Sequence, residues 1–163
     1  MLPITIKTSP NIRIIGMKKE ISFAENKTTE LWQSFMPRRK EISNPINTDL
    51  YSMSFYPKDF FTSFDIHKKF EKGAGMSVNT IENIPEGMQE INIESGLYAT
   101  FIYKGIAADY PKVFQYVLQQ WIPENNYQID NRPFFEILGE KYKRDSEDSE
   151  EEIWIPVINM LMG

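Results

Sequence analysis

The residues best suited to chemistry lie near the C-terminus, where a carboxylate and an indole share one face of an expected strand. In "EIWIPV" the aliphatic residues alternate with Glu152 and Trp154, and alternation along a strand places the two sets on opposite faces. The aliphatic face belongs against a core. The other face then offers charge pairing and cation–π contact, which suits a cationic aromatic ligand. The alternative interpretation is an edge strand with a solvated glutamate and a surface tryptophan.

Composition removes several other kinds of chemistry. The chain of 163 residues has no cysteine and one histidine, His67, which excludes thiol nucleophiles and multi-histidine metal centres. No Gly-rich phosphate loop precedes a helix, and the acidic run near residue 148 lacks the pattern of a calcium loop. We therefore expect neither a metal nor a cofactor.

Charge argues against direct binding of nucleic acid. The formal net charge is −5, whereas nucleic-acid binders usually carry a clustered basic face. The one dense basic cluster, residues 38–40, follows Pro37 and is typical of a solvated helix end. We expect no specific DNA binding by this chain. The sequence has no run of about 18 apolar residues, so it predicts no membrane span. We expect a cytoplasmic location.

The elements that position these residues form two similar series. In the first half, strand patterns occur in residues 4–23, 50–56 and 61–70, and an amphipathic helix follows residue 26 and is kinked or ended at Pro37. Asn26 and the two threonines after it are candidate caps, and "GAG" at residues 73–75 is a candidate bulge.

The second half repeats this order. Strand-rich residues 88–105 precede a helix that Asp109 is expected to cap and Pro123 to end, and strands at 132–138 and 151–160 follow. We therefore predict one α+β domain over residues 1–163. It would contain duplicated strand-helix-strand-strand units (about 1–84 and 85–163), two long helices and a concave, mainly antiparallel sheet.

The second half also resembles a known family. "GLYATFIYKG", "WIPENNYQIDNRPFFEI" and "EEIWIPV" are similar, in order and spacing, to segments of GyrI-like small-molecule-binding domains, which include effector-binding domains of bacterial transcription activators. The resemblance implies a ligand in the cleft between the halves and a glutamate reaching it from the last strand. By position this is Glu152, with Glu151 as the register alternative. Asn125 and Asn126 depart from the family pattern, where a small residue and a glycine are expected.

The resemblance implies a small-molecule-binding protein for apolar or cationic, multidrug-type ligands. Because no helix-turn-helix is recognisable, we expect a stand-alone domain, with no assignable protein partner. The alternative is a hydrolase of reactive small molecules that uses Glu152 with a tyrosine, Tyr51 or Tyr103. Further aromatic residues that are candidates to line the cleft are Tyr51, Phe55, Tyr98, Tyr103, Trp121 and Phe135.

Overall fold

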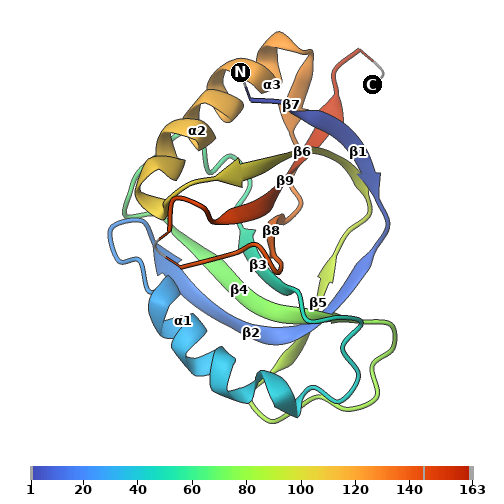
Figure 1. Cartoon of the computed structure of the whole chain (residues 1–163). Helices are drawn as coiled ribbons and strands as arrows, with labels where there is room; N and C mark the ends of the chain where they lie inside the picture. The colour runs from blue at the N-terminus through green and yellow to red at the C-terminus, as the bar shows by residue number, and fades with distance from the viewer. Residues whose placement is uncertain (1, 145, 162–163) are drawn as a thin grey trace.

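A computed structural model describes residues 2–144 and 146–161, and the predicted domain bounds at residues 1 and 163 lie outside these ranges. Nine strands form one sheet in which every paired strand is antiparallel (Figure 1). The strands are β1 (Thr5–Ser9), β2 (Ile12–Ser22), β3 (Leu50–Phe55), β4 (Lys69–Val78), β5 (Gln89–Ile93), β6 (Gly96–Lys104), β7 (Tyr127–Ile129), β8 (Phe134–Leu138) and β9 (Glu150–Asn159).

Two helical segments accompany the sheet. The first is α1 (Thr28–Phe35), which a 3₁₀ segment, Met36–Glu41, continues past Pro37. The second begins with a 3₁₀ turn, Ala107–Asp109, and runs through α2 (Tyr110–Tyr116), a π-turn at Val117–Trp121 and α3 (Ile122–Glu124). No helix among the described residues is long and apolar enough to cross a membrane.

The strand order is β1-β6-β9-β8-β3-β4-β2-β5. This order is symmetric: if each strand is replaced by its counterpart in the other half, the same order is obtained when read from the opposite end. The first strand of each half pairs with the second strand of the other half at an edge of the sheet, since β1 pairs with β6 and β5 pairs with β2. Strands β3 and β8 meet at the centre of the sheet. This arrangement matches the predicted α+β architecture of duplicated units, with β7 as an addition to the second.

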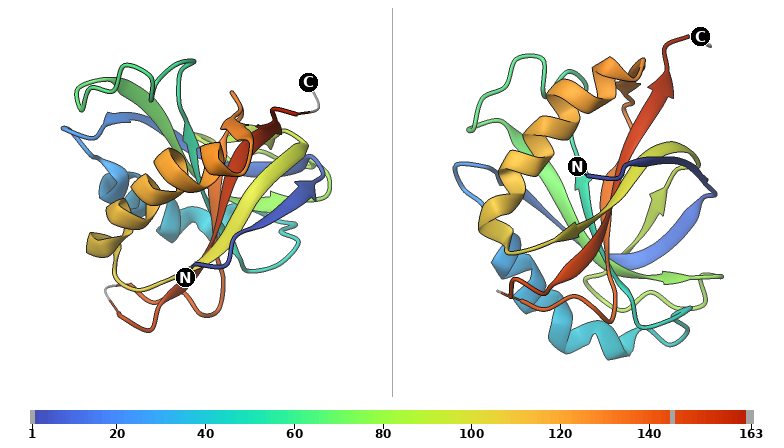
Figure 2. Two further views of the ribbon diagram at one scale, coloured as in Figure 1. Left: turned by 90° about the horizontal axis from the view of Figure 1, so that it is seen from above. Right: turned by 45° about the horizontal axis from the view of Figure 1, so that its top comes forward.

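Both helices lie on one face of the sheet, as both views of Figure 2 show. The register carries a single row of side chains across that face, from Ala74 through Ser52 and Glu136 to Ile153. Helix α1 packs at the Ala74 end, and the α2 segment packs at the Ile153 end. The two helices therefore flank the central strands instead of covering them.

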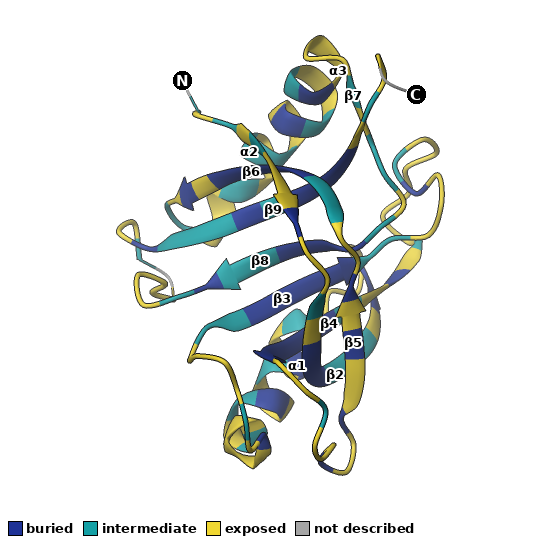
Figure 3. Ribbon diagram, turned by 90° about the vertical axis from the view of Figure 1, so that its right-hand side faces the viewer, coloured by how far each residue is buried: buried dark blue, intermediate teal, exposed yellow. Residues whose placement is uncertain are grey.

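The opposite face of the sheet closes on itself. Residues from β2, β5, β6 and β8, strands spread across the whole sheet, share one buried cluster there. Figure 3 shows this face, with the ribbon buried along much of β3 and β9. The apolar side chains of this cluster all come from strands, and the guanidinium of Arg132, a loop residue, lies 4.7 Å from the centroid of the Tyr98 ring.

Two local predictions were wrong. The expected strand at 61–70 is mostly turns, and β4 begins only at Lys69, because the aromatic residues there pack as a loop cluster instead of alternating between faces. The expected bulge at 73–75 is absent from a β2·β4 register that runs unbroken. The glycines instead allow close approach, since a Cβ on Gly16 would lie 2.0 Å from the Ala74 carbonyl oxygen.

The helix ends correct a third prediction. Asp109 was expected to cap the second helix, but it lies inside a helical turn and makes no capping hydrogen bond with its side chain. At α1 the prediction was better, because the Asn26 Oδ1 accepts a hydrogen bond from the Thr28 backbone N–H at 3.1 Å. Asn126, in place of the expected glycine, has φ 63°, a left-handed conformation that asparagine tolerates.

Candidate ligand-binding site

A cavity of about 710 Å³ lies on the helix-bearing face, over the central strands. One wall is α2, the other is the chain between β3 and β4, and the floor is the sheet. Both halves of the chain contribute. The lining residues are Phe23, Ser52, Ser54, Tyr56, Phe61, Phe64, Lys72, Tyr110, Pro111, Phe114, Gln115, Leu118, Gln119, Ile129, Phe134, Phe135, Glu136, Ile153, Trp154 and Ile155.

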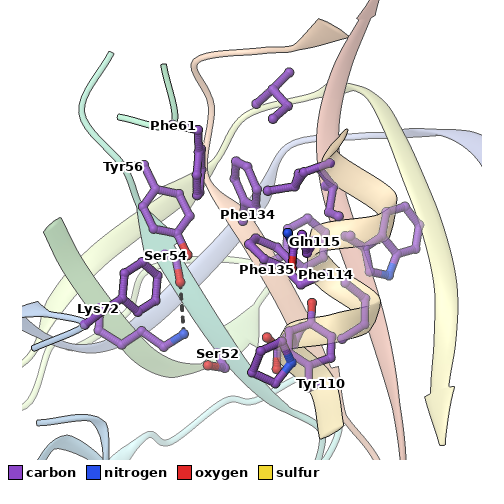
Figure 4. Close-up of a pocket in the computed structure, with 18 of the residues that line it drawn as sticks. Ser52, Ser54, Tyr56, Phe61, Lys72, Tyr110, Phe114, Gln115, Phe134 and Phe135 are labelled. Carbon is purple, nitrogen blue, oxygen red and sulfur yellow. Dashed lines mark hydrogen bonds between the residues drawn. The ribbon is translucent and has the colours of Figure 1, made fainter. Parts of the chain in front are cut away.

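The walls of the cavity are mostly aromatic. Phe61 and Phe134 lie with ring centroids 5.8 Å apart, and Phe114 of α2 lies 6.0 Å from Phe61 (Figure 4). Tyr56 meets Phe134 edge-on at 4.9 Å. At the mouth of the cavity the aromatic wall is partly exposed to solvent, and Phe64 there is 53% exposed. Such walls offer stacking and edge contacts to a flat or multi-ring ligand.

The floor carries the polar groups. Ser52 and Ser54 of β3 and Glu136 of β8 point to this face. In the register Ser52 pairs with Glu136, and Ser54 pairs with Lys72 of β4. The Lys72 Nζ donates a hydrogen bond of 2.9 Å to the Ser54 Oγ (Figure 4). Neither Lys72 nor Glu136 takes part in an ion pair with the described residues. A ligand in the cavity therefore meets both side chains, with Glu136 next to Glu151 and Lys72 bound to Ser54.

A second carboxyl group adjoins this floor. Glu151 of β9 is diagonal to Glu136, because Glu136 pairs with Ile153 two residues further along the strand. The pKa of Glu151 is raised to about 8, chiefly by burial and also by repulsion from Glu136 and a hydrogen bond between the two carboxyl groups, whereas Lys72 opposes the shift. At neutral pH this site holds a proton.

Tyr110 stands where the acid pair meets the aromatic wall. Its ring packs edge-on against Tyr103 at 5.0 Å, and burial raises its pKa well above the usual value, with smaller contributions from Glu136 and Glu151. The Tyr103 hydroxyl donates to the Ile106 carbonyl oxygen at 2.5 Å. Of the two tyrosines, Tyr110 lines the cavity.

Sequence and structure comparisons identify the family and the fold of this chain. A family model described as the GyrI-like small molecule binding domain matches residues 2–158. The chain belongs to this family. The transcriptional regulator BrlR of Pseudomonas aeruginosa is 23% identical over 150 residues, which are 91% of this chain and 53% of BrlR. This GyrI-like chain thus spans about half the length of its curated relative.

Two solved structures show the same fold at low sequence identity. The protein SAV2435 bound to tetraphenylphosphonium has a TM-score of 0.71 and 16% identity, covering 96% of this chain and 94% of that one. A hydrolase encoded by lin2189 from Listeria innocua has a TM-score of 0.61 and 11% identity, covering 95% and 91%. At these identities the likeness concerns the fold of the GyrI-like domain.

The structure places the predicted pair Glu152 and Trp154 together but turns their side chains away from the cavity. The Trp154 Nε1 donates a hydrogen bond of 3.2 Å to the Glu152 Oε1. The indole stacks on Phe135 at 5.4 Å within the interior of the opposite face. The pair therefore lies on the sheet face opposite the cavity, and its contact with a ligand stays a prediction. Trp154 and Phe135 border the cavity from the floor, with their rings on the far side.

The other predicted aromatic residues lie apart from the cavity. Tyr51, Phe55 and Tyr98 pack in the interior of the opposite face. Trp121 stacks on Tyr127 at 6.4 Å, outside the lining. Tyr103 lies on the correct face, beside Glu151 in the register. Whether any of them contacts a ligand stays a prediction.

Several lining residues were missed at the level of sequence. Tyr110 lies four residues before Phe114, so extending the apolar stripe of the helix by one turn identifies it. Glu136 alternates with aromatic residues in "RPFFEIL", which is a readable signal. The π-turn at Val117–Trp121, of a kind frequent at functional sites, had no such signal, although Leu118 and Gln119 of this turn line the cavity.

Proposed function

We propose that this GyrI-like domain binds lipophilic cations with aromatic groups in the cavity beside α2, as a cytoplasmic, non-catalytic sensor of multidrug-type compounds. The observation that carries the proposal is Glu136, an acid on the floor of an aromatic cavity that forms no ion pair with the part of the chain that the structure describes. A cation there gains charge pairing at the floor and ring contacts from the walls. The tetraphenylphosphonium bound by SAV2435 has this chemistry.

A role in transcription would involve more than this domain. BrlR is a transcriptional regulator, and the present chain covers 53% of it. We propose that the domain supplies ligand recognition and does not itself read a DNA sequence, in keeping with its net charge of −5. Sequence-selective gel retardation by the purified chain would overturn that part of the proposal.

The binding proposal is tested by titrating the chain with tetraphenylphosphonium, read by calorimetry. Glu136→Gln keeps the shape and removes the charge, so it should weaken binding of the cation by about 1–3 kcal/mol. Glu152→Gln is the matched control, because its side chain lies on the opposite face of β9 and accepts a hydrogen bond from Trp154. Equal losses in the two variants would remove Glu136 as the recognition group, and no binding by the wild-type chain would reject the proposal.

A second candidate is hydrolysis of a reactive electrophile on the same floor. The observation in its favour is the neutral carboxylic acid at Glu151 beside Glu136 and Tyr110, since a protonated acid next to a carboxylate can act as general acid and base. The test is turnover of a simple aromatic epoxide, with Glu151→Gln as the inactive variant. Binding without turnover favours the sensor.

A further inference from the structure

We propose that a cation entering this cavity expels a proton held between Glu136 and Glu151, so that ligand binding is an exchange of one positive charge for another. This inference rests on the proposed binding of cations. It adds that the domain responds jointly to the ligand and to pH.

The geometry supplies the proton-holding site. Glu136 and Glu151 lie on one face of the adjacent strands β8 and β9, at diagonal positions within reach of each other, and the proximity of Glu136 contributes to the raised pKa of Glu151. Two carboxylates so placed repel each other unless a proton lies between them. One member of the pair, Glu136, borders the cavity.

The other titratable groups around the pair keep their protons in the pH range where Glu151 loses its own. Three tyrosines face the pair, namely Tyr56 directly after β3, Tyr103 of β6 and Tyr110 of α2, and burial raises the pKa of each. The hydroxyls therefore stay neutral where Glu151 loses its proton. Among the described residues, the other charge that acts on Glu151 is the ammonium of Lys72, which donates a hydrogen bond to Ser54.

A ligand cation changes this balance. Its charge beside Glu136 favours the doubly ionised pair, as any nearby opposite charge favours a carboxylate. The proton then leaves to the buffer, and the empty and occupied sites carry the same total charge. Because the pKa of Glu151 is about 8 in the empty cavity, roughly nine-tenths of a proton should be released per cation at pH 7.

The experiment measures how many protons are released per bound cation, and it uses a probe that has no titratable proton. Tetraphenylphosphonium is titrated by calorimetry at pH 7 in phosphate and in Tris, whose ionisation enthalpies differ, and the difference in observed heat gives the protons released. The affinity is also measured from pH 6 to pH 9. It should rise about tenfold per unit up to pH 8 and level off above. Triphenylphosphine oxide, a neutral aromatic probe, should show neither effect.

Substitutions test whether the released proton comes from the Glu136–Glu151 pair. Glu151→Gln should abolish proton release and flatten the pH profile while still binding the cation, and Glu136→Gln should also abolish release. Glu152→Gln should release the proton as the wild-type chain does. Binding of the cation with no proton released, or release unchanged in Glu151→Gln, would overturn the exchange while leaving the binding proposal intact. No binding from pH 6 to pH 9 would reject both.

Discussion

Glu151 and Glu152 are neighbours in the sequence but lie on opposite faces of β9. Glu151 stands opposite Tyr103 and beside the cavity-lining Glu136, whereas Glu152 stands opposite Ile102 and accepts a hydrogen bond from Trp154. The two side chains therefore meet different surroundings, one an acid pair and the other an interior of sheet residues. A pair of single substitutions can separate their roles.

The first prediction concerns stability and pH. The pKa of Glu151 is raised to about 8 in the folded chain from an ordinary value of 4.5. Between these values the folded state holds a proton that the unfolded state has lost, so stability declines as pH rises. Glu151→Gln removes this decline. Its stability relative to the wild-type chain should therefore grow from about pH 5 to pH 8.

Because the group is partly exposed, we expect a gain on the order of 1–2 kcal/mol at pH 8, seen as about 2–4 °C per kcal/mol in thermal unfolding. Glu152→Gln should show no such growth with pH. A constant difference between Glu151→Gln and the wild-type chain over this range would mean that Glu151 is ionised in the folded state.

The second prediction concerns Lys72, whose ammonium group borders the cavity. A fixed positive charge opposes a bound cation, so Lys72→Met should tighten binding of tetraphenylphosphonium by about 1 kcal/mol. The matched control is Lys19→Met, since Lys19 pairs with Lys72 in the register but is bound to Glu30 and lies outside the lining. Weaker binding in Lys72→Met would show that the lysine helps to hold the ligand.

Local alternation was readable from the sequence, but the side of the sheet on which the cavity lies was not. The pattern of "EIWIPV" correctly separated Glu152 from its aliphatic neighbours. Which face meets the cavity depends on both helices packing on one side and on β5 and β6 closing the other, and no segment encodes this by itself. The pairing of Glu136 with Glu151 likewise arises from the β8·β9 register.

The third prediction tests the close contact between β2 and β4. In Gly16→Ala the new Cβ would lie 2.0 Å from the Ala74 carbonyl oxygen, a backbone atom that no rotamer change can move. We expect a loss of at least about 2 kcal/mol in urea unfolding. Gly139→Ala is the control, because its Cβ would meet only the Asp49 side chain, at 3.3 Å. A loss below about 0.5 kcal/mol in Gly16→Ala would show that the two strands can separate.

The last prediction distinguishes the wall of the cavity from its floor. Phe114 contacts Phe61 across the cavity and is uncharged, so Phe114→Ala removes ring contacts and leaves the acid pair in place. It should weaken tetraphenylphosphonium and the neutral triphenylphosphine oxide by the same amount, about 1–3 kcal/mol, at every pH. Glu136→Gln, in contrast, should affect the cation alone.

Tyr116→Ala is the control for this change, since Tyr116 lies two residues further along the same helix, is 38% exposed and is outside the lining. Affinities are compared at a temperature where all variants are folded, because Phe114 also packs on the core of the second half. If Phe114→Ala weakened the cation but spared the neutral probe, its ring would act through cation–π attraction to the charge. If both probes bound as well as before, the ligand would lie elsewhere in the molecule.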